Sequence, residues 1–223
     1  MLSGAGAIRM DNVMFVGPMG SGKTFYSNIL ISKGYKRIAL ADPIKELEAG
    51  ITWGENLVKL ATPFINRVPE YGIDELRAMV KILRIAGDMP REEPKPRARL
   101  QYIGTEGGRE MIDQDIWIKI LKGTVEAEPD TNWVCDDCRF VNEYELLKDT
   151  FTVVKVLIDE ETQLARLSKD YPDFDPKVLE HASEQDIKKI HPTLSIDGTL
   201  SLEDATRRLE EIINDDKLLH RSG

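Results

Sequence analysis

The sequence predicts an α/β fold in which a parallel sheet of about five strands is covered by helices. Short apolar runs alternate with longer amphipathic stretches, which is the pattern of consecutive β-α units. A glycine-rich turn separates the first apolar run from the first amphipathic stretch. Between about residues 43 and 130 the spacing is helical without a convincing strand, so we expect a helical insertion there.

The individual elements follow from the spacing of apolar residues. Strands are predicted where apolar and β-branched residues form short runs, at residues 12–16, 36–40, 132–136, 152–158 and 193–196. Helices are predicted where apolar residues recur three or four positions apart, at residues 23–32, 73–85, 109–121, 142–148, 161–169 and 202–213. The proline-rich segments 87–96 and 170–176 are predicted to be loops, either solvated connections or lids beside a site.

Composition and charge exclude some classes of protein. The chain has 223 residues, with 30 Lys and Arg against 39 Asp and Glu, and so a net charge of −9. This argues against a protein that grips long duplex DNA or an anionic membrane, although a local basic pocket is compatible with it. We expect a cytoplasmic protein, because we find neither a run of about 18 apolar residues nor the segments of a signal peptide.

The cysteines and tryptophans favour structural roles. Cys135 and Cys138 form a C-x-x-C pair, but no second ligand pair lies at a spacing typical of zinc sites. We therefore interpret them as reduced thiols beside the end of a strand. Trp53, Trp117 and Trp133 have apolar neighbours and are expected in the core, although Trp117 could flank a bound base.

Residues 17–24 read GPMGSGKT and match the motif G-x-x-x-x-G-K-[ST], between an apolar run and a helical stretch. Glycines allow the backbone to wrap closely around phosphate oxygens, and the helix N-terminus directs unpaired N–H groups at them. Lys23 would add a positive charge near the β- and γ-phosphates, and Thr24 would place its hydroxyl on Mg²⁺. We predict a nucleotide site for ATP and Mg²⁺ formed by Gly17, Gly20, Ser21, Gly22, Lys23 and Thr24.

The motif at residues 17–24 is a P-loop, and the rest of the sequence limits which class of P-loop protein this chain can be. The chain has neither the D-x-x-G turn nor the [NT]-K-x-D motif of GTPase switches, and a translocating ATPase would usually be longer. A small phosphotransferase remains, whose acceptor must be held by cationic groups. Arginines beside glycine, acidic or loop residues are candidates, although any single one could be a surface charge: Arg97, Arg99, Arg109, Arg139 and Arg166.

Further blocks of sequence carry a resemblance to a family. Residues 100–109 read LQYIGTEGGR, residues 137–143 read DCRFVNE directly after an expected strand, and residues 40–45 read LADPIK. HASE at 181–184 and IDGT at 196–199 follow later. In order and spacing these blocks resemble the phage-type deoxynucleoside monophosphate kinases over nearly the whole chain.

The resemblance implies a single P-loop kinase domain over residues 1–223. Its core would comprise about residues 10–42 and 131–216, its helical substrate region about 43–130, and its lid about 160–185. Arg109 and Arg139 would clamp the acceptor phosphate, and Arg166 would stabilise the transferring phosphoryl group. The implied catalytic residues are Lys23, Asp42, Arg109, Arg139 and Arg166, the metal ligands are Thr24 and Asp137, and the acceptor-binding residues are Asp42, Lys45, Arg97, Arg99, Gln101, Thr105, Arg109, Asp137, Arg139 and Glu143.

Several positions leave alternatives open. Asp42 would either cap a helix or orient the acceptor or a Mg²⁺-bound water. Asp136 and Asp137 are both candidates for the carboxylate beside Mg²⁺, and the D-x-R-F match favours Asp137. Ser183 could simply cap a helix. The chain departs from the family at Ile158-Asp159-Glu160 and at Ile196-Asp197, whereas Gln163 and Arg166 resemble the start of the lid helix in dephospho-coenzyme A kinases.

The leading hypothesis is therefore an ATP- and Mg²⁺-dependent kinase that converts deoxynucleoside monophosphates to diphosphates. An alternative is phosphorylation of a 5-hydroxymethyl pyrimidine within phage DNA, for which Asp42 would serve as the base and an open basic groove is expected. A third is a nucleotide-binding module without turnover. The leading hypothesis implies a small-molecule nucleotide partner, no membrane, nucleic acid only under the alternative, and the host cytoplasm if the chain is phage-encoded. It leaves the oligomeric state open, a homodimer included.

Overall fold

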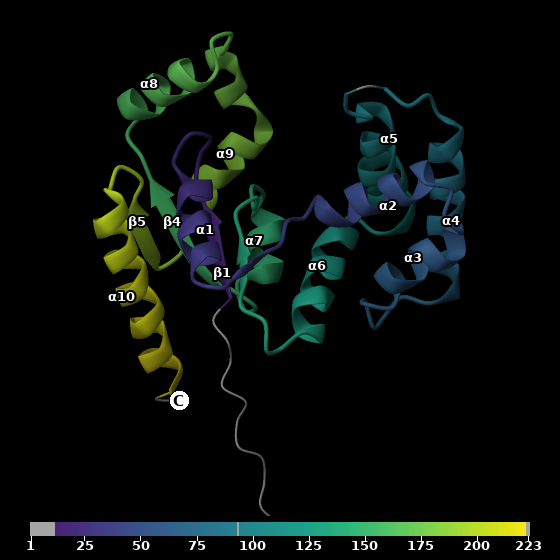
Figure 1. Ribbon diagram of the computed structural model, residues 1–223, viewed down its shortest axis with the longest axis horizontal. Helices are drawn as coiled ribbons and strands as arrows, with labels where there is room; N and C mark the ends of the chain where they lie inside the picture. The colour runs from purple at the N-terminus through teal and green to yellow at the C-terminus, as the bar shows by residue number, and fades with distance from the viewer. Residues whose placement is uncertain (1–11, 93, 222–223) are drawn as a thin grey trace, which may run out of the picture. The chain divides into compact units, whose positions relative to one another are not determined.

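The structure, a computed structural model, describes residues 12–92 and 94–221 (Figure 1). The chain divides into two compact units. One, here called the sheet unit, consists of Met1–Ile38 and Pro129–Gly223, and the other, the helical unit, consists of Ala39–Glu128. These boundaries lie close to those of the helical insertion expected at about 43–130. Among the described residues, no helix is both long enough and apolar enough to cross a membrane.

The sheet unit contains a five-stranded sheet with the strand order β2-β3-β1-β4-β5. All four neighbouring pairs are parallel, which confirms the predicted α/β fold class. The strands are β1 (Val13–Val16), β2 (Lys36–Arg37), β3 (Trp133–Cys135), β4 (Thr152–Leu157) and β5 (Leu194–Asp197). The helices of this unit are α1 (Lys23–Ser32), α7 (Val141–Leu147), α8 (Glu160–Asp170), the 3₁₀-helix η2 (Pro176–Glu180), α9 (Ala182–Lys189) and α10 (Leu202–Arg221).

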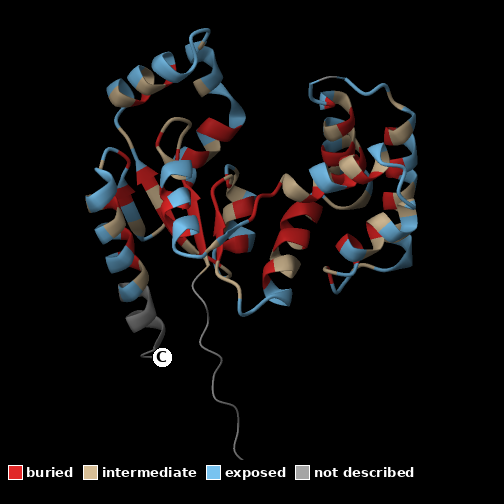
Figure 2. Cartoon of the chain, viewed as in Figure 1, coloured by how far each residue is buried: buried red, intermediate tan, exposed pale blue. Residues whose placement is uncertain are grey.

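The central strand β1 is buried and pairs with a neighbour on each side. All four of its residues, VMFV, are fully buried, as expected of a parallel strand covered on both faces. Val13 lies opposite Val134 on one neighbour and Thr152 on the other. Figure 2 shows buried residues concentrated on the strands and on the inner sides of the helices. Side chains of α1 and α10, among them Tyr26 and Leu209, complete one core.

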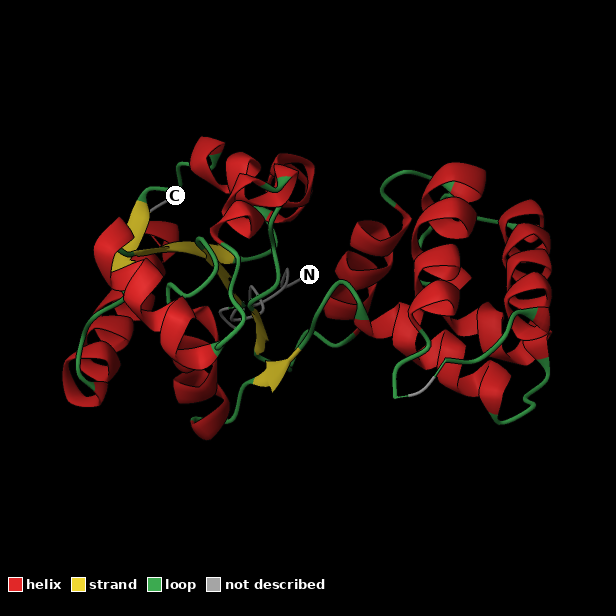
Figure 3. Ribbon diagram, turned by 90° about the horizontal axis from the view of Figure 1, so that it is seen from above, coloured by secondary structure: helices red, strands yellow, loops and turns green. Residues whose placement is uncertain are grey.

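The helical unit has a separate core and, among its described residues, helices without strands (Figure 3). Its elements are α2 (Asp42–Thr52), α3 (Leu57–Ile65), α4 (Ile73–Asp88), α5 (Arg97–Gln101), the π-helix η1 (Tyr102–Ile112) and α6 (Ile116–Ala127). Leu47, Met79, Ile82, Ile103 and Trp117 are fully or almost fully buried in this core. The Trp117 ring nitrogen donates a hydrogen bond to the Gly104 carbonyl over 2.7 Å, which satisfies its polar group in the core.

Some of the sequence predictions differ from the structure. The helix predicted at 109–121 is two elements, because Asp113 accepts from the backbone N–H of Asp115 (2.8 Å) and turns the chain between η1 and α6. The second strand ends at Arg37 instead of residue 40. Trp117 and Trp133 are buried as predicted, but the prediction was wrong for Trp53, which ends α2 and is 79% exposed.

Gly123 of α6 packs closely against the backbone that follows α3. A Cβ at this position would lie 1.9 Å from the Arg67 carbonyl oxygen, so backbone would have to move. We expect Gly123→Ala to lower the free energy of unfolding by about 2–3 kcal/mol, despite the roughly 1 kcal/mol that alanine normally gains in a helix. Urea unfolding measures the change. The exposed neighbour Glu126→Ala should stay within about 0.5 kcal/mol, and a Gly123→Ala protein as stable as wild type would contradict the close approach.

Candidate active site

The loop between β1 and α1 has the backbone conformation of a phosphate cradle. Gly17, Gly20 and Gly22 have positive φ angles of 157°, 77° and 103°, which side chains with a Cβ rarely adopt. A Cβ at Gly17 would also lie 2.6 Å from the Val156 carbonyl oxygen. Helix α1 begins at Lys23, and among the described residues no side chain caps its N-terminus. Its first N–H groups are therefore available to an anion.

Lys23 lies within this loop. Its Nζ donates hydrogen bonds to the carbonyl oxygens of Gly17 (2.6 Å) and Pro18 (2.9 Å). Burial lowers the pKa of Lys23 to about 8, and the positive charge of Arg139 acts in the same direction. The carboxylates of Glu184 and Asp136 oppose both effects. An ammonium group held in this way is stabilised further by any anion that enters the loop.

Thr24 is joined to the carboxyl end of β3 through Asp136. The Thr24 hydroxyl donates to Asp136 Oδ2 over 3.1 Å, and Asp136 Oδ1 accepts from Nε (3.1 Å) and Nη2 (2.9 Å) of Arg37. The Asp136 side chain is only 3% exposed, so it is a buried, fully paired carboxylate. Sequence reasoning missed Arg37, because one arginine at the end of a short strand carries no motif.

The two aspartates after β3 therefore have different surroundings. Asp137 Oδ1 accepts from the Cys135 thiol over 3.2 Å, whereas Asp136 holds Thr24. The assignment of Asp137 to the metal, favoured by its motif, stays a prediction, and the geometry adds Asp136 as the carboxylate beside Thr24. Among the described residues, no group of three or more His, Cys, Asp or Glu is arranged as a metal site. Cys135 and Cys138 are free and buried, and burial raises the pKa of both thiols.

Side chains from α8 and α9 hold the outer part of the loop. Glu184 Oε2 accepts from the backbone N–H of Met19 (3.0 Å), and Gln163 Nε2 donates to the Met19 carbonyl (2.8 Å). Arg166 donates to the carbonyls of Gly20 (3.3 Å) and Gly198 (3.0 Å). The predicted lid, at about residues 160–185, thus holds the backbone of the loop between β1 and α1 in place.

The sequence predicts no site role for Glu184, although this residue belongs to the HASE block. Its side chain is buried, and its contact with Met19 joins residues 165 positions apart in the sequence. The expectation that Ser183 caps α9 was wrong: His181 is the N-cap, and its Nδ1 accepts from the Ser183 N–H over 3.3 Å. The HASE block therefore contains one cap and one contact to the loop.

Arg139 and Glu143 lie at the start of α7. Glu143 is buried, and its Oε2 accepts from the backbone N–H groups of Arg139 (2.7 Å) and Phe140 (3.0 Å), so it secures the helix N-terminus. The Arg139 side chain is exposed, and its charge acts on Lys23. Of the residues predicted from sequence, Lys23, Thr24, Arg139 and Arg166 are thus arranged about one loop.

The remaining predicted residues belong to the helical unit. Asp42 lies in the first turn of α2, where its Oδ2 accepts from the Ala39 N–H (2.8 Å) and its Oδ1 pairs with Lys45 Nζ (3.4 Å). Ala41, not Asp42, is the N-cap of α2. Arg97 is exposed at the start of α5, and Gln101, Thr105 and Arg109 lie on α5 and η1.

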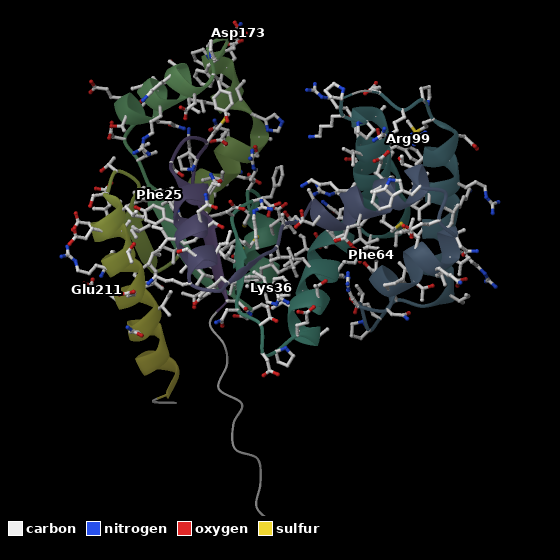
Figure 4. All side chains as sticks on the ribbon, in the orientation of Figure 1. Phe25, Lys36, Phe64, Arg99, Asp173 and Glu211 are labelled. Atoms are coloured by element: carbon white, nitrogen blue, oxygen red, sulfur yellow. The ribbon has the colours of Figure 1, made fainter. Side chains whose placement is uncertain are left out.

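Arg99, in contrast, is buried among the helices of its unit (Figure 4). Its guanidinium donates to the carbonyls of Met89 (2.6 Å) and Gly87 (3.2 Å), and Nη1 lies 3.6 Å from Glu48 Oε1. These contacts close the C-terminal end of α4. A structural role accounts for all of these contacts, and the role of Arg99 at the acceptor stays a prediction.

Comparisons with known proteins support the resemblance over part of the chain. No family model matches. The chain is 42% identical over 55 residues to deoxynucleoside-5′-monophosphate kinase of Escherichia phage T5, and this match confirms the resemblance. It spans 25% of the chain and 22% of the phage protein.

Two solved structures align with most of the chain. One is a gluconokinase from Sinorhizobium meliloti 1021, with a TM-score of 0.49 and 12% identity over 96% of this chain and 99% of that one. The other is shikimate kinase from Acinetobacter baumannii, with a TM-score of 0.48 and 16% identity over 94% and 96%. The fold class is assigned from the chain's own parallel sheet and strand order.

Proposed function

We propose that this chain is an ATP- and Mg²⁺-dependent kinase that phosphorylates deoxynucleoside monophosphates. The observation that carries the proposal is the arrangement around residues 17–24: positive-φ glycines, a half-buried Lys23 ammonium, and the Thr24 hydroxyl on the buried Asp136 carboxylate. The buried Ser21 hydroxyl, without a hydrogen-bond partner among the described atoms, also fits a loop that receives phosphate oxygens. The motif blocks and the partial phage relative support the acceptor class.

Phosphoryl transfer requires positioning and charge stabilisation more than covalent help from the protein. Lys23 and the α1 N-terminus would hold the β- and γ-phosphates of ATP, and Thr24 with Asp136 would hold Mg²⁺, which neutralises phosphate charge when bound. Arg139 and Arg166 would stabilise negative charge during transfer, and Arg109 would hold the acceptor phosphate. The acceptor needs no strong base, because a monophosphate is already largely dianionic at neutral pH.

The proposal is tested by measuring ADP release with ATP and Mg²⁺ against a panel of dTMP, dGMP, dCMP, dAMP, their ribonucleotide counterparts and hydroxymethyluracil-containing DNA. Turnover on at least one free deoxynucleotide, with a diphosphate product seen by chromatography, is expected. Turnover on the DNA alone would replace the proposal with a kinase that acts on a base in DNA. ATP binding without transfer to any acceptor would indicate a non-catalytic module. A cytoplasmic location belongs to the same proposal, because its nucleotide substrates are found there.

The lowered pKa of Lys23 predicts a pH dependence. Only the protonated amine attracts phosphate, so kcat/KM for ATP should fall above pH 8, approaching tenfold for each further pH unit. Bound triphosphate favours the charged amine, so kcat at saturating ATP should hold to higher pH. Initial rates between pH 6.5 and 9.5 test this. The negative charge of Glu184 raises the pKa of Lys23, so Glu184→Gln should move the fall to lower pH; a flat wild-type profile to pH 9.5 would contradict the assignment.

A further inference from the structure

The π-helix η1 is the least regular part of the helical unit. It runs for 11 residues, Tyr102–Ile112, and ends with a hydrogen bond from the Asp113 N–H to the Gly108 carbonyl, five residues earlier. Helices of this kind are rare, usually last a single turn, and are frequent at functional sites. Gly107 and Gly108 allow it to pack closely, because a Cβ at either would lie 2.5 Å from Ile82 or Trp117 side-chain atoms.

The repeat of a π-helix differs from that of an α-helix, so different residues lie on the same side of η1. In an α-helix, residues five positions apart point about 140° away from each other. In a π-helix the i→i+5 repeat brings them close together, and Gln101 Nε2 here donates to Glu106 Oε1 over 3.0 Å. Glu106 thus joins Gln101 on one side of the helix. The resemblance implies acceptor roles for Gln101, Thr105 and Arg109 but not for Glu106, although all four belong to the same block of sequence.

The second oxygen of this carboxylate is unpaired. Glu106 Oε2 is buried and lacks a hydrogen-bond partner among the described atoms. A buried carboxylate oxygen without a donor is costly, and native proteins usually supply one from the protein, a water or a ligand. Its neighbour Gln101 is exposed, so the carboxylate lies close to the surface of the unit. An ionised carboxylate only accepts hydrogen bonds, so its partner must present an O–H or N–H group.

We propose that Glu106 Oε2 accepts a hydrogen bond from the nucleoside part of the acceptor and determines specificity for it. The inference rests on the proposed function. It assigns to η1 a contact with the uncharged part of the acceptor, which the arginines, as phosphate ligands, cannot supply. The donor is either a sugar hydroxyl or an N–H group of the base, and the two sources are separated by experiment.

Glu106→Gln is a sharp test because it keeps the size of the side chain but removes its charge. With the Gln101 amide oriented as in the structure, the new amide oxygen accepts from Gln101 and the NH₂ takes the place of Oε2, where it would face the donor of the ligand. We expect the Kd for the preferred deoxynucleoside monophosphate, measured by calorimetry, and its KM to rise at least tenfold. The KM for ATP and the melting temperature should stay unchanged. Glu110→Gln, an exposed carboxylate on the same helix, is the matched control and should leave all four values unchanged.

Substrate analogues identify the donor. If it is the 3′-hydroxyl, wild type should bind the 2′,3′-dideoxynucleotide at least tenfold more weakly than the deoxynucleotide, and Glu106→Gln should bind both alike. If it belongs to the base, the variant should change the order of preference among the four bases instead. An unchanged acceptor Kd and KM in Glu106→Gln overturns this inference while leaving the kinase proposal intact. Failure of wild type both to bind and to phosphorylate any monophosphate overturns both.

Discussion

Replacing Lys23 with alanine is expected to lower kcat/KM for phosphoryl transfer from ATP by at least about 10³-fold. The Lys23 ammonium is half-buried within the phosphate loop, and its contacts there are with carbonyl oxygens that a bound phosphate would outcompete for the charge. Alanine removes the charge without changing the glycine conformations that shape the loop. The variant should therefore fold normally. It should bind ATP more weakly and no longer stabilise the phosphoryl group during transfer. Coupled ADP release, with calorimetric titration of ATP, measures both effects.

The matched control is Lys33→Ala, at the other end of the same helix. Lys33 pairs with Glu210 on the surface of the sheet unit, and such pairs contribute little to stability and nothing to chemistry at the opposite end of α1. Its activity should stay within twofold of wild type. If Lys23→Ala kept more than a tenth of the wild-type rate, residues 17–24 would not hold the reacting phosphates, and the proposed function would lose the observation on which it rests.

The sheet could be predicted because its determinants are local. Buried parallel strands are short apolar runs such as VMFV, and the motif after the first run requires glycines at positions where the φ angles are indeed positive. The strand order could not be read from the chain, because it depends on which apolar faces pack against each other over long sequence separations. The central place of β1 between β3 and β4 was found only in the structure.

Within the site, the sequence predicts residues that belong to motifs, but it does not indicate the residues that contact them from distant parts of the chain. Lys23 and Thr24 belong to one contiguous motif, but Arg37 reaches Asp136 across 99 sequence positions and Glu184 reaches Met19 across 165. Arg99 was predicted as an acceptor ligand from its motif-rich neighbourhood. The fold gives its side chain internal contacts that no local pattern indicates, and its role at the acceptor stays a prediction. Glu106 was not among the predicted site residues, because the sequence does not show that one of its carboxylate oxygens is buried and lacks a partner among the described atoms.

Asp136→Asn is expected to lower kcat by about 10²- to 10³-fold, with a higher Mg²⁺ concentration needed for half-maximal rate. Asparagine keeps the shape and an oxygen that can accept from the Thr24 hydroxyl, but it removes the charge that pairs with Arg37 and that would attract a cation. Asp137→Asn should change kcat by less than about threefold, because its carboxylate oxygen accepts from the Cys135 thiol instead of Thr24. Magnesium titrations of ADP release for both variants give the comparison.

The two variants together show whether Asp136 or Asp137 is the carboxylate that acts with magnesium. The D-x-R-F block favours Asp137 as the magnesium carboxylate, whereas the contacts of Thr24 favour Asp136. A larger loss in Asp137→Asn would show that the carboxylates exchange partners when nucleotide binds, and that the Thr24–Asp136 contact belongs to the ligand-free loop. Because Asp136→Asn also leaves Arg37 without its buried partner, melting temperatures are measured in parallel. A loss of rate at 25 °C in a protein that is still fully folded then reports on magnesium and not on stability.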